Sequence, residues 1–200
     1  MKRRLRLEEV SDPAVLRAMD VVPREEFVPG HLRGAAYDDC ALPIECGQTI
    51  SQPAVVAYMT EQLHLAPGDR VLKMGTGSGY QAAVLAEIVR DVYSLERIPE
   101  LARAAEARLA RLQYANVHVR QGDGTLGWPE AAPFDAIMVT AAADDIPPAL
   151  IAQLVIGGRL IMPVGGSYGE QVLMLLERKT PDEIISHRLW PVRFVPLIPG

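Results

Sequence analysis

The sequence predicts an α/β fold: a doubly wound, mostly parallel sheet with an antiparallel C-terminal strand pair and an N-terminal helical and looped extension. Between residues 70 and 163, short apolar runs alternate with helical segments, which is typical of parallel strands joined by crossover helices. Two later apolar runs, 172–177 and 184–195, are separated only by a turn at 179–182. Because a parallel pair needs a longer crossover, these two strands must be antiparallel.

The N-terminal extension, residues 1–66, contains two expected helices. The first should begin at Ser11-Asp12-Pro13, where a capping side chain precedes a first-turn proline. Two prolines follow it, and we expect the chain to run extended or looped as far as Gln48. The second helix should begin near Pro53.

Residues 67–200 carry the strand and helix alternation. We expect strands at 70–74, 92–96, 117–120, 134–140 and 158–163, and helices at 80–89, from Pro99 onward, and at 147–154. We expect the extension and this core together to form one domain over residues 1–200.

Composition limits the class of protein. The 200 residues are 49% hydrophobic and 22% charged, which fits one globular domain able to bury its own core. The formal net charge is -5, so no basic surplus is available for a nucleic-acid partner. No apolar run approaches a membrane span, and we expect no membrane partner.

The basic N-terminal segment, residues 1–6, is followed by Glu8 and Glu9 instead of an apolar core, so we expect a cytoplasmic rather than a secreted protein. Cys40 and Cys46 are too few for a disulfide framework, and the four scattered histidines do not complete a zinc site with them. Free thiols and no bound metal are therefore expected.

The chemistry is predicted to lie at the ends of three successive strands. The turn Gly75-x-Gly77-x-Gly79 joins a predicted strand to a predicted helix, where glycines permit a tight turn and close approach of a ligand. Glu96 ends the next strand, where a carboxylate can accept both hydrogen bonds of a ribose diol. Asp123 follows the third strand. Taken by themselves, the glycines also fit an ordinary strand-to-helix turn. The glycine turn, Glu96 and Asp123 together indicate a nucleoside site.

The G-x-G-x-G turn, the acidic residues after the next two strands and the antiparallel final pair resemble the class I S-adenosylmethionine-dependent methyltransferases, which have a Rossmann-like sheet. Within that class, the sequence resembles the protein-L-isoaspartate O-methyltransferase family, and this resemblance covers nearly the whole chain. Segment 48–53 is specific to that family. The segments that carry the resemblance are 23–29, 36–44, 47–53, 75–83, 96–97, 122–124, 128–129, 134–137 and 193–197.

The resemblance implies an enzyme that methylates the free α-carboxylate of L-isoaspartyl residues in damaged proteins and peptides. S-adenosyl-L-methionine is the implied donor and S-adenosyl-L-homocysteine the product. The ester then cyclises to a succinimide, whose hydrolysis returns some normal aspartate. A carboxylate is ionised at pH 7, so the reaction needs orientation of its reactants and no general base. Isoaspartyl proteins and peptides are the implied partners, and we expect a monomer.

The same resemblance implies the site residues. For the cofactor they are Gly75, Thr76, Gly77, Ser78, Gly79, Glu96, Arg97, Asp123 and Gly124, and for the substrate Thr49, Ile50 and Ser51. Ser51 is the implied catalytic serine, whose hydroxyl orients the acceptor carboxylate. From sequence alone, Ser51 also fits the N-cap of the helix near Pro53. Both roles can hold together, because a helix N-terminus favours an anion.

Lys73 departs from the family pattern, in which the residue two before the first glycine of the turn is normally acidic. An ammonium facing the cofactor repels S-adenosylmethionine, which carries a sulfonium, more than the product. Alternatively, the long side chain reaches solvent, where its charge is screened. Two other functions stay open: a methyltransferase that installs a modified aspartate in a dedicated peptide, and a weakly active or non-catalytic module that binds isoaspartyl residues or the cofactor.

Overall fold

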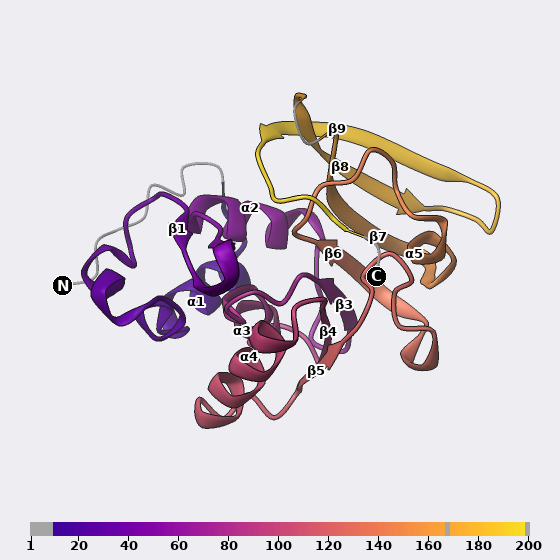
Figure 1. The fold of residues 1–200 in the computed structure, drawn as a ribbon. Helices are drawn as coiled ribbons and strands as arrows, with labels where there is room; N and C mark the ends of the chain where they lie inside the picture. Colours follow the sequence, from indigo (N-terminus) through magenta and orange to yellow (C-terminus); the bar gives the residue numbers. More distant parts are fainter. Residues whose placement is uncertain (1–9, 167–168, 199–200) are drawn as a thin grey trace.

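The computed structural model describes residues 10–166 and 169–198. The basic segment 1–6, used above to argue against secretion, lies outside the described residues. Seven strands form one sheet in the order β5-β4-β3-β6-β7-β8-β9, and β1 and β2 form a separate pair (Figure 1). The strands are β1 (Leu42–Pro43), β2 (Thr49–Ile50), β3 (Arg70–Met74), β4 (Asp91–Glu96), β5 (Val117–Gln121), β6 (Phe134–Val139), β7 (Leu154–Val164), β8 (Gln171–Arg178) and β9 (Ile184–Val192). The α-helices are α1 (Pro13–Val21), α2 (Pro53–Gln62), α3 (Tyr80–Ala86), α4 (Pro99–Arg111) and α5 (Pro148–Ala152).

The first part of the sheet is parallel, as the sequence predicts. β3 lies between β4 and β6, with β5 beyond β4 and β7 beyond β6. The chain runs outward from β3 to β5 and then returns to the other side of β3 as β6. This reversal of strand order marks the point where open α/β sheets bind ligands, beyond the carboxyl ends of the strands.

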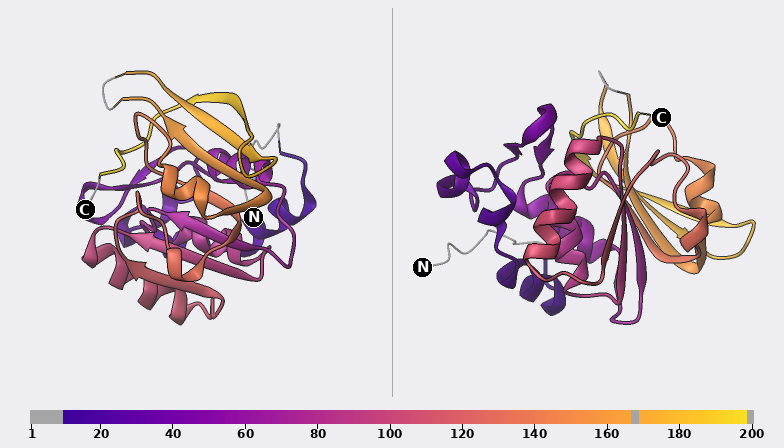
Figure 2. Two further views of the ribbon diagram at one scale, coloured as in Figure 1. Left: turned by 90° about the vertical axis from the view of Figure 1, so that its right-hand side faces the viewer. Right: turned by 60° about the horizontal axis from the view of Figure 1, so that its bottom comes forward.

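The last two strands are antiparallel, which confirms the prediction for the C-terminal pair. β8 pairs antiparallel with β7, and β9 with β8. α4 and α5 lie on opposite faces of the sheet, as the right-hand view of Figure 2 shows, so the core is covered on both sides.

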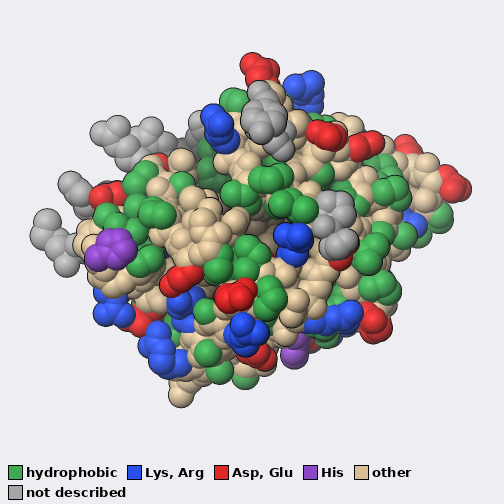
Figure 3. Space-filling view, in the orientation of Figure 1, with side chains coloured by type: hydrophobic (Ala, Val, Ile, Leu, Met, Phe, Trp, Pro, Cys, Tyr) green, Lys and Arg blue, Asp and Glu red, His purple; other side chains and the backbone are tan. Residues whose placement is uncertain are grey.

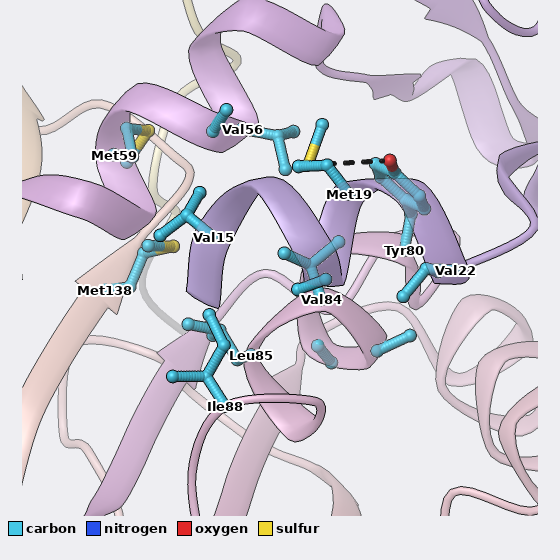
Figure 4. Close-up of a cluster of buried hydrophobic side chains, with 14 of the residues drawn as sticks. Val15, Met19, Val22, Val56, Met59, Tyr80, Val84, Leu85, Ile88 and Met138 are labelled. Atoms are coloured by element: carbon cyan, nitrogen blue, oxygen red, sulfur yellow. Dashed lines mark hydrogen bonds between the residues drawn. The ribbon is translucent and has the colours of Figure 1, made fainter. Parts of the chain in front are cut away.

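Alternate residues of the central strands supply two apolar layers. Val71 and Val92 belong to the layer that also contains side chains of α1 to α4, whereas Leu72 and Met74 belong to the layer with α5. Figure 4 shows where α1, α2 and α3 meet within the first layer. Because strand residues alternate between faces, Lys73 lies on the same face of β3 as Val71.

The N-terminal extension differs in part from the prediction. α1 begins at Pro13, and the Asp12 carboxylate accepts a hydrogen bond from the backbone N–H of Ala14 at 2.7 Å, so the predicted cap is confirmed. The chain up to Gln48 is not simply looped, since it forms β1 and the 3-10 helices η1 (Arg24–Phe27), η2 (Gly30–Ala35) and η3 (Glu45–Gly47). Pro23 and Pro29 directly precede the first two. Their fixed φ angles favour such tight single turns over a longer helix.

Charged side chains of both signs are interspersed with apolar ones on the face shown in Figure 3. Within the described ranges, no helix combines the length and apolar character that a membrane crossing requires. Cys40 and Cys46 are exposed free thiols.

Candidate active site

A cavity of about 1130 Å³ opens where β3, β4 and β6 end, and we call it the strand-end cavity. One wall is made by the turns that follow these strands, and includes Gly75, Glu96 and Thr140. A second wall comes from the N-terminal extension and includes Ser51. A third is the segment 190–198. Residues predicted for the cofactor and for the substrate therefore line one cavity.

The three glycines of the turn after β3 have different surroundings. Gly75 and Gly77 line the strand-end cavity with φ angles of 77° and 55°, in the left-handed region that favours glycine. A Cβ added to Gly75 would lie 3.2 Å from Thr140 Oγ1. Gly79, with φ of 91°, faces away, and an added Cβ would lie 3.4 Å from the side chain of Leu109 on α4. The first two glycines leave the cavity open, and the third lets α3 begin close to α4.

The carboxylate of Glu96 is fixed in the wall at the end of β4. The Glu96 side chain is nearly buried, with 6% of the residue exposed. Its Oε2 accepts a hydrogen bond from the backbone N–H of Gly77 at 2.8 Å, and its Oε1 accepts one from that of Ile98 at 3.0 Å. Each carboxylate oxygen can accept a further hydrogen bond. Glu96 can therefore receive two hydroxyl hydrogens from a ligand while it holds the glycine turn.

The remaining predicted cofactor residues divide into two groups. Arg97 and Gly124 line the strand-end cavity. Thr76, Ser78 and Asp123 hold the surrounding turns, and none of the three is among the described residues that line it. The Thr76 and Ser94 hydroxyls lie 2.7 Å apart, the Ser78 carbonyl accepts from Arg108 Nη1 at 2.7 Å, and Asp123 Oδ1 accepts from Thr125 N at 2.8 Å.

Residues of the predicted substrate segment alternate between the strand-end cavity and the core. Thr49 and Ser51 line the strand-end cavity, whereas Ile50, 4% exposed, packs in the core between them. β1 and β2 pair antiparallel, with Ile50 opposite Leu42, and this pairing holds the segment extended.

A buried arginine that the sequence analysis did not single out also fixes this segment. Arg24 Nη2 donates to the Ser51 carbonyl at 2.8 Å, and Nε donates to the Ala36 carbonyl at 2.7 Å. The Arg24 guanidinium lies over the Tyr80 ring, 4.7 Å from its centroid. Arg24 itself is 0% exposed. Only its place in the family-like segment 23–29 could have drawn attention to it.

The prediction that Ser51 is the N-cap of the second helix is wrong. The N-cap of α2 is Gln52, which makes no side-chain capping hydrogen bond. The first-turn N–H of Ala54 donates instead to Asp39 Oδ1 at 3.0 Å. Asp39 is thus the anion at this helix N-terminus, and the Ser51 hydroxyl is not engaged in capping the helix.

The third wall was not predicted as part of the site. Trp190 of β9 lines the strand-end cavity and stacks on Tyr58 of α2, with ring centroids 3.7 Å apart and planes 10° apart. Further along, Ala142 N donates to the Val195 carbonyl at 2.8 Å, and Leu197 N donates to the Ala142 carbonyl at 2.7 Å. These backbone bonds fold the segment back onto the turn after β6. Its signal in the sequence was the family-like segment 193–197.

Lys73 is neither exposed nor screened by solvent, so the alternative that its side chain reaches solvent is wrong. It is 2% exposed, and its Nζ donates to the carbonyls of Met74 at 3.2 Å and of Gly75, and to Thr140 Oγ1 at 2.6 Å. Burial lowers the pKa of Lys73 to about 7, and the nearby Glu96 carboxylate opposes this shift. The ammonium thus lies directly behind the glycine turn.

The described residues that line the strand-end cavity include no histidine or cysteine. In the part of the chain that the structure describes, no group of three His, Cys, Asp or Glu side chains is placed to hold a metal ion. Thr49, Ser51 and Glu96 supply polar groups that can bind and orient a ligand in the cavity.

The fold and the arrangement of the strand-end cavity define a class I S-adenosylmethionine-dependent methyltransferase. The model of the protein-L-isoaspartate(D-aspartate) O-methyltransferase family matches residues 1–200. The chain belongs to this family.

Relatives and solved structures agree with this assignment. The chain is 58% identical to protein-L-isoaspartate O-methyltransferase 1 of Geotalea uraniireducens over 94% of this chain and 86% of that protein. It is 59% identical to protein-L-isoaspartate O-methyltransferase 2 of Pelobacter propionicus over 94% of this chain and 84% of that protein.

Two solved structures named for the same enzyme have the same fold. One has a TM-score of 0.85 and 33% identity, and the match covers 95% of this chain and 63% of that one. The other, from Plasmodium falciparum, is described as a complex with S-adenosyl-L-homocysteine and has a TM-score of 0.83 and 29% identity, with 96% of each chain covered.

Proposed function

We propose that the strand-end cavity binds S-adenosylmethionine against Gly75, Gly77 and Glu96, and binds an isoaspartyl carboxylate on the side of Ser51. The chain is a methyltransferase of the protein-L-isoaspartate family, and its reaction is methylation of the free carboxylate of L-isoaspartyl residues in damaged proteins and peptides. The observation that carries the proposal is that the glycine turn, Glu96 and Ser51 line one cavity.

The residues present fit this cofactor. The cavity volume of about 1130 Å³ is slightly above the range usual for single-ligand pockets, so a nucleoside and an acceptor side chain can be held together. Glu96 offers free acceptor positions for a ribose diol, and Leu95, Ile98 and Leu101 give an apolar surface for a flat base. The Gly75 turn leaves backbone room that a side chain would fill.

When bound, S-adenosylmethionine supplies an electrophilic methyl group on a sulfonium. The acceptor carboxylate is already ionised at neutral pH and attacks without a general base. The Ser51 hydroxyl donates to one carboxylate oxygen, which orients the other oxygen for attack. The new bond joins carboxylate oxygen to methyl carbon, and the carbon–sulfur bond breaks, leaving S-adenosylhomocysteine and a methyl ester. Orientation of this kind supplies about 7 kcal/mol or more of the barrier reduction.

We also propose the location, the oligomeric state and the partners of the enzyme. We place it in the cytoplasm as a monomer that acts on isoaspartyl proteins and peptides, with no nucleic-acid or membrane partner. The formal net charge of -5 supports the absence of a nucleic-acid partner. The relatives reported above lend no support to the two alternatives, a methyltransferase that installs a modified aspartate and a non-catalytic binding module.

The acceptor half of the proposal is tested with a pair of peptides that differ only in an isoaspartyl or a normal aspartyl residue. We expect radiolabelled methyl transfer to the isoaspartyl peptide alone. Ser51→Ala should reduce kcat and leave the Kd of S-adenosylmethionine unchanged, because the hydroxyl is proposed to touch only the acceptor. Equal labelling of both peptides, or full activity of Ser51→Ala, would contradict the proposal.

The cofactor half is tested with Glu96→Ala. This change removes the proposed ribose acceptor and also the acceptors for the N–H groups of Gly77 and Ile98. We expect the cofactor to bind about 2–3 kcal/mol more weakly, roughly a hundredfold in Kd by calorimetry. Glu106→Ala, on the exposed face of α4, is the control and should bind normally. An unchanged Kd in Glu96→Ala would exclude Glu96 as a cofactor ligand.

A further inference from the structure

Lys73 is a buried cation whose hydrogen-bond partners are all neutral. The acceptors of its Nζ are the Met74 and Gly75 carbonyls and the Thr140 hydroxyl. The Glu96 carboxylate acts on Lys73 through space, as a weaker influence than burial. A desolvated ammonium without a direct counter-ion is sensitive to any further positive charge placed near it.

The Lys73 ammonium lies behind the wall of the strand-end cavity. Gly75 and Thr140, two of its hydrogen-bond partners, line that cavity. A Cβ added to Gly75 would lie 4.0 Å from Lys73 Nζ. One layer of backbone therefore separates the ammonium from the space proposed for the cofactor, and little water screens the two from each other.

Lys73 can lose its proton without disturbing the glycine turn. As an ammonium, Nζ donates to all three acceptors. As a neutral amine, it keeps two donors for the Met74 and Gly75 carbonyls and accepts a hydrogen bond from the Thr140 hydroxyl. Both protonation states are satisfied in the same geometry. Since burial lowers the pKa of Lys73 to about 7, both states are also populated near neutral pH.

We propose that Lys73 links cofactor binding to a proton, so that S-adenosylmethionine binds with loss of the Lys73 proton and S-adenosylhomocysteine binds without it. The two ligands share the adenosine, amino and carboxylate groups, and differ in the positive charge of the sulfonium. Binding the sulfonium near an ammonium is unfavourable. Nζ relieves this repulsion when the ammonium becomes a neutral amine and its proton passes to the buffer. The enzyme thereby distinguishes fresh donor from spent product by charge, an inference that rests on the cofactor site proposed above.

The other charged groups around Lys73 do not account for such a pH dependence. From β4, the Glu96 carboxylate faces Lys73, and from β6 its neighbour is the uncharged Thr140. Arg97 and Arg193 also line the cavity, but a guanidinium stays charged throughout the neutral range. No histidine is among the described lining residues. The amino group that both ligands carry titrates in both, and comparison with a Lys73 variant removes its contribution.

The experiment is isothermal calorimetry of the full chain with each ligand at pH 6 and pH 8. In the native protein we expect the Kd of S-adenosylmethionine to fall roughly tenfold as the pH rises, because the binding-competent neutral fraction of Lys73 rises by about that factor. The Kd of S-adenosylhomocysteine should change by less than about threefold. At pH 7, titrations in two buffers of different ionisation enthalpy should show release of about half a proton with S-adenosylmethionine only.

Three variants complete the experiment. Lys73→Met should remove the difference in pH dependence between the two ligands. Lys179→Met, which removes a lysine 44% exposed on its side chain, should keep that difference. Lys73→Arg keeps a permanent cation and should bind S-adenosylmethionine weakly at both pH values. Equal pH dependence for both ligands, or an unchanged dependence in Lys73→Met, would overturn the proposal.

This design separates failure of the Lys73 proposal from failure of the proposed methyl-transfer function. If Lys73→Met does not fold, as judged by circular dichroism, the two-buffer proton count on the native protein decides the question. The binding measurement needs no acceptor peptide. Loss of methyl transfer with intact proton release would therefore count against the proposed acceptor chemistry and support the Lys73 proposal.

Discussion

Arg24 shows how much a single buried side chain contributes to the acceptor side of the site. Its guanidinium joins three parts of the chain: the Ala36 carbonyl, the Ser51 carbonyl and the Tyr80 ring. Its remaining nitrogen, Nη1, is buried without a hydrogen-bond partner among the described residues. Such a residue is expensive to bury, and burial lowers its pKa. Its benefit is a fixed position for the Ser51 backbone, and hence for the side-chain hydroxyl that is proposed to orient the acceptor carboxylate.

We therefore predict that Arg24→Met raises the KM for an isoaspartyl peptide while the Kd of S-adenosylmethionine changes little. The change leaves the Ala36 and Ser51 carbonyls without their donor and should reduce the free energy of unfolding by about 2–4 kcal/mol. Peptide kinetics, calorimetry and urea unfolding measure the three quantities. Arg33→Met, which removes an arginine 57% exposed on its side chain, is the control. A variant that loses cofactor and peptide binding equally would show that Arg24 supports the fold alone.

The turn between β3 and α3 contributes both to the strand-end cavity and to the packing of α3 against α4. Gly75 and Gly77 line the strand-end cavity, and Gly79 allows α3 to approach α4. The family resemblance implies that all three glycines belong to the cofactor site. In this chain, packing of two helices explains the third.

Gly79→Ala tests this division. At a φ of 91° an alanine is strained, and its Cβ meets the Leu109 side chain at 3.4 Å. We expect the free energy of unfolding to fall by about 1–2 kcal/mol. The free energy of cofactor binding should change by less than this. Gly68→Ala, in a loop where nothing lies within 4 Å of an added Cβ, should leave both unchanged. A large loss of affinity without a loss of stability would instead place Gly79 at the ligand.

The elements were predictable where local pattern decides them. Apolar runs and first-turn prolines gave the parallel strands and the starts of α1, α2 and α4, because these signals are contained within a few residues. The burial of Lys73 was not predictable, since its partner Thr140 is 67 positions away in the sequence. The same holds for the third wall, whose position depends on backbone bonds between Ala142 and residues near the end of the chain. Long-range contacts of this kind leave no periodicity in the sequence.

For the whole molecule, the two outer strands of the sheet decide whether copies of the chain can pair edge to edge. β9 carries Pro191, which has no N–H to donate, and the exposed Arg188. At the other edge, β5 carries His118 and Arg120, which face Asp91 and Glu130 at 3.2 and 3.1 Å. Prolines and charged side chains on edge strands oppose pairing with another sheet.

We therefore predict a monomer in solution, measured by sedimentation equilibrium at micromolar concentration. On the β9 edge, the apolar residues that could oppose this outcome are Ile184 and Ile185, exposed by 37% and 38%. If a dimer is found, Ile185→Lys shows whether it forms through β9. A dimer abolished by this variant would mean that the proline and charges do not protect the edge.

The position of the third wall also determines when during synthesis the site can exist. Residues 190–198 close the strand-end cavity, and Trp190 reaches across to Tyr58 in the first third of the chain. A ribosome-bound chain that has been synthesised only as far as β6 can pair β3, β4 and β6, yet its glycine turn is open to solvent and it has no enclosed site. We therefore expect cofactor binding to begin only after segment 190–198 has left the exit tunnel.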